Sequence, residues 1–291
     1  MPRGIDHLVL CVNDLKKARA HYEKLGFTMT PQAQHPFGTG NTLAQLQGCF
    51  LEVLAVTQPE DITEADGDSF SFAAFNRDFL SGREGFSMLV LDSADEKADR
   101  AEFLERNLHV YAPFEFQRLA KLPDGSEETV GFSLTFVGDE SLPDLGFFTC
   151  KQWRPDLFWK EDYQKHANGA ETIDEVFLVT PEPSAPVQFL ATFADATDFE
   201  VDEGIARIRT ERGALGVYTP AAFENRFPGA FDAAHFAAPC LAGFAVKTAN
   251  AEKAASLWRE NGLDVHDTNG VRWLHPTDAF GCVIAAVQAS G

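Results

Sequence analysis

Two titratable residues stand inside apolar segments of the sequence and could carry its chemistry. His7 lies within the apolar run 5–12, and Glu52 lies within the apolar run 49–56. A buried imidazole or carboxylate without a partner is costly, because each loses its hydration. The two side chains could satisfy one another through a hydrogen bond. Alternatively, an imidazole nitrogen and a carboxylate oxygen could bind a divalent ion such as Zn, Ni, Mn or Fe.

Two further segments hold candidates for ligand binding. His35 and Asn41 belong to the glycine-bearing stretch HPFGTGN, and polar groups on such a loop can line the mouth of a cleft. Trp153 and Arg154 follow the last strand pattern of the first half, and an aromatic ring beside a guanidinium can bind an anionic or planar ligand. Each feature also has a structural explanation, a turn in one case and arginine packed on tryptophan in the other.

A repeated pattern indicates which elements position these residues. Strand, short turn, helix and a Gly or Asn stop recur in the segments IDHLVLCVNDLKKARAHYEKLGF, FSMLVLDSADEKADRAEFLERNL and LAGFAVKTANAEKAASLWRENGL, with a weaker, proline-bearing copy from Ile173. Short strand candidates follow each helix. The sequence therefore predicts an α+β fold of four βαβββ modules.

The first repeat makes a specific prediction about its helix. Asn13 or Asp14 can cap the first turn, and Ala18, Tyr22 and Leu25 then fall on one buried face. The polar stretch WKEDYQKHANGAET predicts a boundary that divides the chain into halves of residues 1–165 and 166–291, each a pair of modules. Residues 58–85 are interpreted as a linker followed by a short helix.

Composition excludes several classes of partner. The chain has 291 residues, 45% of them hydrophobic, and 26 phenylalanines that need an interior. Its net charge of −20 would repel nucleic acid and anionic membranes. Five widely spaced cysteines without a C-x-x-C motif favour reduced thiols in a cytoplasm. No apolar run is long enough to span a bilayer, and no signal peptide is indicated.

The four units, a histidine in an opening strand and a glutamate in the closing strand of the same unit resemble the vicinal oxygen chelate superfamily. That superfamily includes glyoxalase I, extradiol dioxygenases, and fosfomycin or bleomycin resistance proteins. The phrases HPFGTGNTLAQL and FFTCKQWRPDLFW resemble a glyoxalase-like subgroup. The resemblance implies two paired, curved mixed sheets with helices outside, and it implies little about the reaction, because one scaffold hosts many chemistries.

The resemblance also implies metal ligands. His7 and Glu52 match the positions that hold a divalent ion in such modules. The second module departs from the pattern, because our alignment places Met88 at the histidine position and Thr149 at the glutamate position. In the second half these positions hold Glu175, expected to be a solvated strand-end residue, then Gly243 and Ala285. We expect no extradiol set of two histidines and one glutamate, and we interpret the second half as a scaffold or pocket wall.

Two functions remain open at this point. The first is a divalent-metal-dependent enzyme of the lyase or isomerase type, which acts on a small oxygenated metabolite and uses Glu52 in catalysis. The second is a metal-free protein that binds or sequesters a small molecule. An extradiol dioxygenase is disfavoured, no further cofactor is expected, and a homo-oligomer is possible.

Overall fold

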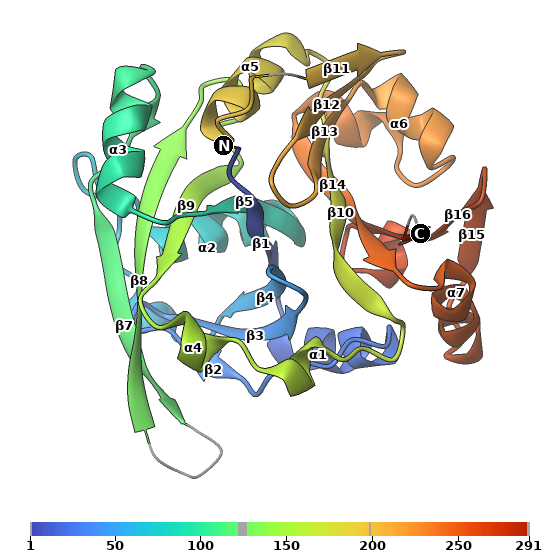
Figure 1. Ribbon diagram of the computed structural model, residues 1–291, viewed down its shortest axis with the longest axis horizontal. Helices are drawn as coiled ribbons and strands as arrows, with labels where there is room; N and C mark the ends of the chain where they lie inside the picture. Colours follow the sequence, from blue (N-terminus) through green and yellow to red (C-terminus); the bar gives the residue numbers. More distant parts are fainter. Residues whose placement is uncertain (1, 122–126, 198, 290–291) are drawn as a thin grey trace.

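The computed structural model describes residues 2–121, 127–197 and 199–289, which form two lobes side by side (Figure 1). The first unit contains β1 (Ile5–Cys11), α1 (Leu15–Lys24), β2 (Ala33–Gln34), β3 (Thr39–Gln45) and β4 (Phe50–Val56). The second contains β5 (Gly85–Asp92), α3 (Glu96–Glu105), β6 (His109–Val110), β7 (Phe114–Lys121), β8 (Glu127–Gly138) and β9 (Gly146–Gln152). The third contains β10 (Ala170–Val179), α5 (Ser184–Phe193), β11 (Phe199–Asp202), β12 (Ile205–Arg209) and β13 (Ala214–Tyr218). The fourth contains β14 (Cys240–Thr248), α7 (Ala251–Glu260), β15 (Val265–Thr268), β16 (Val271–Leu274), η4 (Pro276–Asp278) and β17 (Val283–Gln288).

Short elements connect these units. They are η1 (Pro59–Asp61), α2 (Phe72–Gly82), α4 (Pro155–Phe158), η2 (Glu161–Gln164), α6 (Pro220–Arg226) and η3 (Ala233–Ala237). The predicted α+β fold of four modules is confirmed, with the extra two-residue strand β6 in the second module. The short helix expected before the second module is α2. No helix within the described ranges is both long and apolar enough to cross a bilayer.

Each pair of modules forms one curved mixed sheet. The opening strands lie antiparallel in its middle, β1 beside β5 and β10 beside β14, and each runs parallel to the closing strand of its own module. A single residue pair, Leu241 with Phe86, bridges the two sheets. Helices α1, α3, α5 and α7 pack on the convex faces of the two sheets (Figure 1), and most of their buried residues join one large core.

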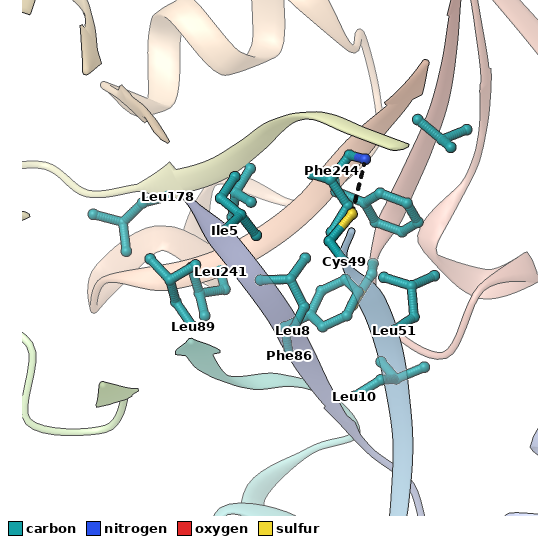
Figure 2. Packing of buried hydrophobic residues seen from close by; sticks show 14 of the residues in the cluster. Ile5, Leu8, Leu10, Cys49, Leu51, Phe86, Leu89, Leu178, Leu241 and Phe244 are labelled. Carbon is teal, nitrogen blue, oxygen red and sulfur yellow. Dashed lines mark hydrogen bonds between the residues drawn. The ribbon is translucent and has the colours of Figure 1, made fainter. Parts of the chain in front are cut away.

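The alternation of β1 divides its side chains between two cores. Leu8 and Leu10 join a large core shared by the two lobes, where Figure 2 shows them near Phe86 and Phe244. Val9 and Cys11 join a separate core in the concave interior of the first sheet. Because side chains alternate along a strand, His7 faces that same interior.

A β-bulge modifies this alternation at the start of β1. Opposite β5 the register steps from Ile5 and Leu91 directly to His7 and Val90, so one residue of β1, Asp6, is left without a partner. Ile5 consequently packs in the shared core, whereas strict alternation would have put it on the same face as His7. The bulge places the Asp6 carboxylate beside the ring of the next residue.

Helix α1 is built as its sequence predicts. The Asp14 side chain accepts a hydrogen bond from the Lys17 amide, and the chain leaves the helix at Gly26 with φ of 89°. Ala18, Tyr22 and Leu25 are fully buried.

Truncation of Leu25 to alanine is therefore expected to lower the free energy of unfolding by about 2 to 5 kcal/mol, as a large-to-small core change does. Leu104→Ala is the matched control, because this leucine of α3 is 53% exposed. Urea melts of both variants measure the difference, and a Leu25→Ala loss no larger than the control's would contradict the packing described here.

His166 anchors the segment between the lobes to the first module. Its Nδ1 accepts a hydrogen bond from the Thr28 amide at 3.0 Å, and its Nε2 donates to the Gln45 carbonyl at 2.7 Å. This arrangement needs the neutral ring, because Nδ1 accepts a hydrogen bond. Burial lowers the pKa of His166, and the hydrogen bond to the Gln45 carbonyl, which raises the pKa, offsets only part of this effect.

We therefore expect His166 to contribute pH-dependent stability. The unfolded chain takes up a proton near the ordinary imidazole value of about 6.5, whereas the folded chain resists it. The contribution is present above that value and is lost as the pH falls through the lower folded pKa. Urea melts between about pH 8 and about pH 5 should show the wild type losing stability relative to His166→Gln. A difference that stays constant with pH would refute this role.

Candidate metal and substrate site

A cavity in the concave interior of the first sheet brings most of the predicted site residues together. It holds about 490 Å³ of space between atoms, including its open mouth. Its lining consists of His7, His35, Phe37, Asn41, Leu43, Phe50, Glu52, Phe72, Phe116, Arg118, Phe132, Leu134, Phe148, Cys150 and Phe158. The wall is mainly aromatic, so the few polar groups stand in a site of low polarity.

His7 is fixed on both faces and at one nitrogen. Its ring stacks on Phe50 with centroids 4.2 Å apart, and the Phe148 ring meets it edge-on at 5.6 Å. Its Nδ1 lies 2.5 Å from Oδ1 of Asp6. A carboxylate accepts hydrogen bonds, so the neutral ring carries its proton on Nδ1 and leaves a lone pair on Nε2. Asp6 thus selects the tautomer of His7, as the partner of a metal-binding histidine does.

Glu52 faces that lone pair from the neighbouring strand. Val9 and Glu52 are paired in the parallel register of β1 and β4, which puts Glu52 diagonally across from His7. The carboxylate is 5% exposed. Its Oε2 lies 3.6 Å from His7 Nε2, and its Oε1 accepts a hydrogen bond from Asn41 Nδ2 at 2.5 Å.

His35 completes the polar cluster. Its Nε2 lies 3.8 Å from Oε1 of Glu52 and accepts a hydrogen bond from Asn41 Nδ2 at 3.2 Å, while its Nδ1 contacts the Thr39 hydroxyl at 2.8 Å. Burial lowers the pKa of His35 to about 4, against the attraction of Glu52. His35 is neutral near pH 7, and its second nitrogen is already occupied by the amide.

These contacts define what the site can bind. His7 Nε2 and Glu52 Oε2 are both acceptors, and they face each other without a hydrogen bond between them. Two bonds of about 2.1 Å from one ion span roughly 3.4 to 3.6 Å at tetrahedral or slightly wider angles, so the pair fits a shared divalent cation. Within the described residues, no three His, Cys, Asp or Glu side chains are arranged to hold one ion. Water or ligand oxygens would fill the other positions.

The second module offers no donors at the corresponding places. Met88 is paired with Val9, and its sulfur contacts the Asn76 amide at 3.9 Å. The residue equivalent to Glu52 is Phe148, because Val90 and Phe148 are paired in the parallel register of β5 and β9. Our assignment of Thr149 to this position was wrong by one residue, and Thr149 lies outside the cavity lining.

The structure separates the remaining candidates. His35 and Asn41 line the cavity, as expected for substrate-binding residues, but Trp153 and Arg154 do not. The Trp153 indole donates to the Ser133 hydroxyl, and Arg154 pairs with Asp156 at the surface. The two residues follow β9 beyond the point where it borders the cavity.

Sequence reasoning missed three features of this site. Asp6 was missed, although a carboxylate next to a strand histidine can accept a hydrogen bond from one nitrogen of its ring. Arg118 was also missed, although it continues the alternation of Phe114 and Phe116 on β7. The approach of His35 to Glu52 was not expected, because a loop residue carries no strand register.

A glyoxalase-like domain profile matches residues 5–194, which is more than half of the chain. The chain belongs to the glyoxalase-like domain family. The resemblance to the vicinal oxygen chelate superfamily is thereby confirmed. No curated protein matches the sequence.

Solved structures share the glyoxalase-like fold at low sequence identity. A hypothetical protein from Staphylococcus aureus has a TM-score of 0.71 and 13% identity, and the match covers 98% of this chain and 99% of that one. A fusion protein of a xylose isomerase-like TIM barrel and a 4-hydroxyphenylpyruvate dioxygenase has a TM-score of 0.62 and 14% identity, over 100% of this chain and 50% of that one. A triple mutant of 4-hydroxymandelate synthase from Streptomyces coelicolor has a TM-score of 0.60 and 11% identity, over 100% and 93%.

The second lobe of this glyoxalase-like protein fills its interior with side chains. Glu175, expected to be solvated at a strand end, is instead 2% exposed. It accepts a hydrogen bond from the Tyr218 hydroxyl at 2.6 Å and forms ion pairs with Arg226 at 2.8 Å and Arg207 at 3.2 Å. The Arg226 guanidinium also lies over the Phe177 ring at 4.8 Å. The position equivalent to His7 is therefore occupied by a satisfied ionic network.

Proposed function

We propose that the protein is a divalent-metal-dependent enzyme of the lyase or isomerase type, which acts on a small oxygenated metabolite in the cavity of the N-terminal half. The observation that carries this proposal is the pair of buried acceptors, His7 Nε2 and Glu52 Oε2, facing one another at 3.6 Å. Two lone pairs at this distance in an apolar cavity are unfavourable unless a cation or a proton stands between them.

The residues around the pair fit the same role. Asp6 holds the His7 ring in the tautomer that offers Nε2, and the flanking Phe50 and Phe148 rings fix its plane. Asn41 holds one Glu52 oxygen and leaves the other free. A bound divalent ion would act as a Lewis acid toward adjacent substrate oxygens.

The proposal gives Glu52 two tasks. Its Oε2 would hold the cation, and the carboxylate is the group we assign to proton transfer. Its hydrogen bond from Asn41 keeps the carboxylate oriented in the cavity during that transfer. The low polarity of the aromatic wall strengthens the electrostatic interactions inside the cavity.

A metal-free binding protein is the second candidate. It is favoured by the lack of donors at Met88 and Phe148, and by the aromatic lining, which suits a flat apolar ligand. An extradiol dioxygenase remains disfavoured, because the third donor that it would need, His35 Nε2, is occupied by the Asn41 amide.

Calorimetric titration of the chelator-treated wild-type protein with Zn, Ni, Mn and Fe(II) tests the proposal. We expect one ion per chain to bind at micromolar concentration. If none of the four ions binds, the metal-dependent enzyme is excluded and the binding protein takes its place.

A further inference from the structure

Arg118 lines the same cavity, and among the described residues no carboxylate forms an ion pair with it. Phe114, Phe116 and Arg118 lie on one face of β7, so the arginine stem follows two aromatic rings inward. Its Nε is buried and has no hydrogen-bond partner within the described part of the chain. Burial lowers the pKa of Arg118, and the more distant charge of Glu52 only partly offsets this effect.

An unpaired guanidinium in such a place calls for an explanation. Most arginines of this chain pair with carboxylates, as Arg226 does with Glu175. A partly buried cation that lacks such a partner costs folding free energy. Its retention in a cavity wall is expected where a ligand supplies the missing anion.

The location of Arg118 fits that role. An outer groove, lined in part by Thr30, Gln34 and Tyr163, adjoins the cavity, and Arg118 lines both. Asn41 also belongs to both linings. Arg118 therefore stands where a ligand would pass from the groove to the His7 and Glu52 pair.

We infer that the substrate is an organic carboxylate whose carboxylate group pairs with Arg118, while its flat apolar body lies among the phenylalanine rings. Its remaining oxygens then face the cation position between His7 and Glu52. This inference rests on the proposed function in taking the cavity as the substrate site. It adds the chemical class of the substrate.

The chemistry of the lining supports a carboxylate over a phosphate ester. The planar edge of a guanidinium matches the two oxygens of one carboxylate. Arg118 is the single cationic side chain among the described lining residues, which is few for a phosphate dianion. The charges of the site also favour a substrate with one negative charge. A divalent ion and Arg118 together carry three positive charges, which exceed the two negative charges of Asp6 and Glu52 by one.

Calorimetry with simple probes tests the inference. Benzoate and cinnamate should bind the wild-type protein at least about tenfold more tightly than benzamide and cinnamamide, since a charge-assisted hydrogen bond is available only to the acids. Arg118→Gln should weaken binding of the acids by about 10- to 100-fold and leave the amides unchanged. Arg154→Gln is the matched control, because Arg154 lies outside the cavity on the protein surface, and it should change neither.

Several results would overturn the inference. They are equal binding of acids and amides by the wild type, unchanged binding of the acids by Arg118→Gln, and no binding of any acid at millimolar concentration. Tighter binding of phenyl phosphate than of benzoate would likewise assign the site to phosphate esters. Arg118→Gln is expected to melt no lower than the wild type, because it removes a partly buried charge that lacks a counter-ion. Loss of folding would therefore not be confused with loss of binding.

The experiment is run with and without the metal ion, so that the two proposals fail separately. Arg118-dependent binding of acids by metal-free protein supports the anion site even if no metal binds. Binding of acids that needs the ion and persists in Arg118→Gln would place the carboxylate on the metal and overturn the role of Arg118.

Discussion

Replacement of Glu52 by glutamine is expected to lower the affinity for a divalent ion by more than about 100-fold, because even changes in the shell around metal ligands cost 10- to 100-fold. The substitution removes the charge and keeps the shape, and Asn41 can still contact the amide. His7→Ala should abolish metal binding in the same way. Titration of both variants with the ion that binds the wild type most tightly measures the effect.

Stability distinguishes a ligand pair from a structural pair. If Glu52 serves as a ligand, the metal-free Glu52→Gln protein should melt at the wild-type temperature or above, because two facing acceptors are relieved. If the pair serves only to hold the fold, both variants should melt lower. Glu200→Gln, an exposed carboxylate of β11 paired with Arg209, is the control and should change neither property. Wild-type metal affinity in Glu52→Gln would rule out the site as described.

Replacement of Glu175 by alanine is expected to lower the free energy of unfolding by about 3 to 5 kcal/mol, as the loss of one partner from a buried ion pair does. The change leaves the Tyr218 hydroxyl and the Arg226 guanidinium without their acceptor in the second lobe. Chemical denaturation of the metal-free protein measures the loss. Glu200→Ala should cost less than about 1 kcal/mol, because exposed pairs contribute little.

The double variant Glu175→Ala/Arg226→Met separates charge from packing. Removal of both charges avoids the uncompensated arginine, so the double variant should be more stable than Glu175→Ala alone. If the double variant is the less stable protein, Arg226 stabilises the lobe mainly by stacking on its aromatic neighbours, and the ionic account of this network is wrong.

The features of the fold that could be predicted from the sequence are those that depend on local periodicity. The alternation of residues 5–12 was enough to turn His7 and Val9 to one face, and the repeat was enough to predict four modules. The alignment also assigned Ala285 to the glutamate position of the fourth module correctly, because β14 and β17 pair Ala245 with Ala285 as β1 and β4 pair Val9 with Glu52. The capped first helix, with Leu25 buried, followed from the spacing of its apolar residues.

The predictions that were wrong depended on contacts between segments that lie far apart in the sequence. The position equivalent to Glu52 fell on Thr149 instead of Phe148, because the register of two parallel strands is set by the sheet and a slip of one residue changes the face. The bulge that turns Ile5 into the shared core cannot be predicted from residue spacing, because it arises in the pairing of β1 with β5. Glu175 appeared solvated because its partners, Arg207 and Arg226, lie 32 and 51 residues further along the chain. The predicted division at residue 165 stays a prediction.

The register of β5 and β9 also identifies the positions at which metal ligands could be added to this fold by design. A protein engineer who wished to tighten a metal centre here would add donors at Met88 and Phe148, which mirror His7 and Glu52 across the approximate twofold axis of the first sheet. A glutamate installed at Thr149 would instead point to the back of the sheet. The register therefore identifies Met88 and Phe148, and not Thr149, as the places in the second module where added donors would face the concave interior.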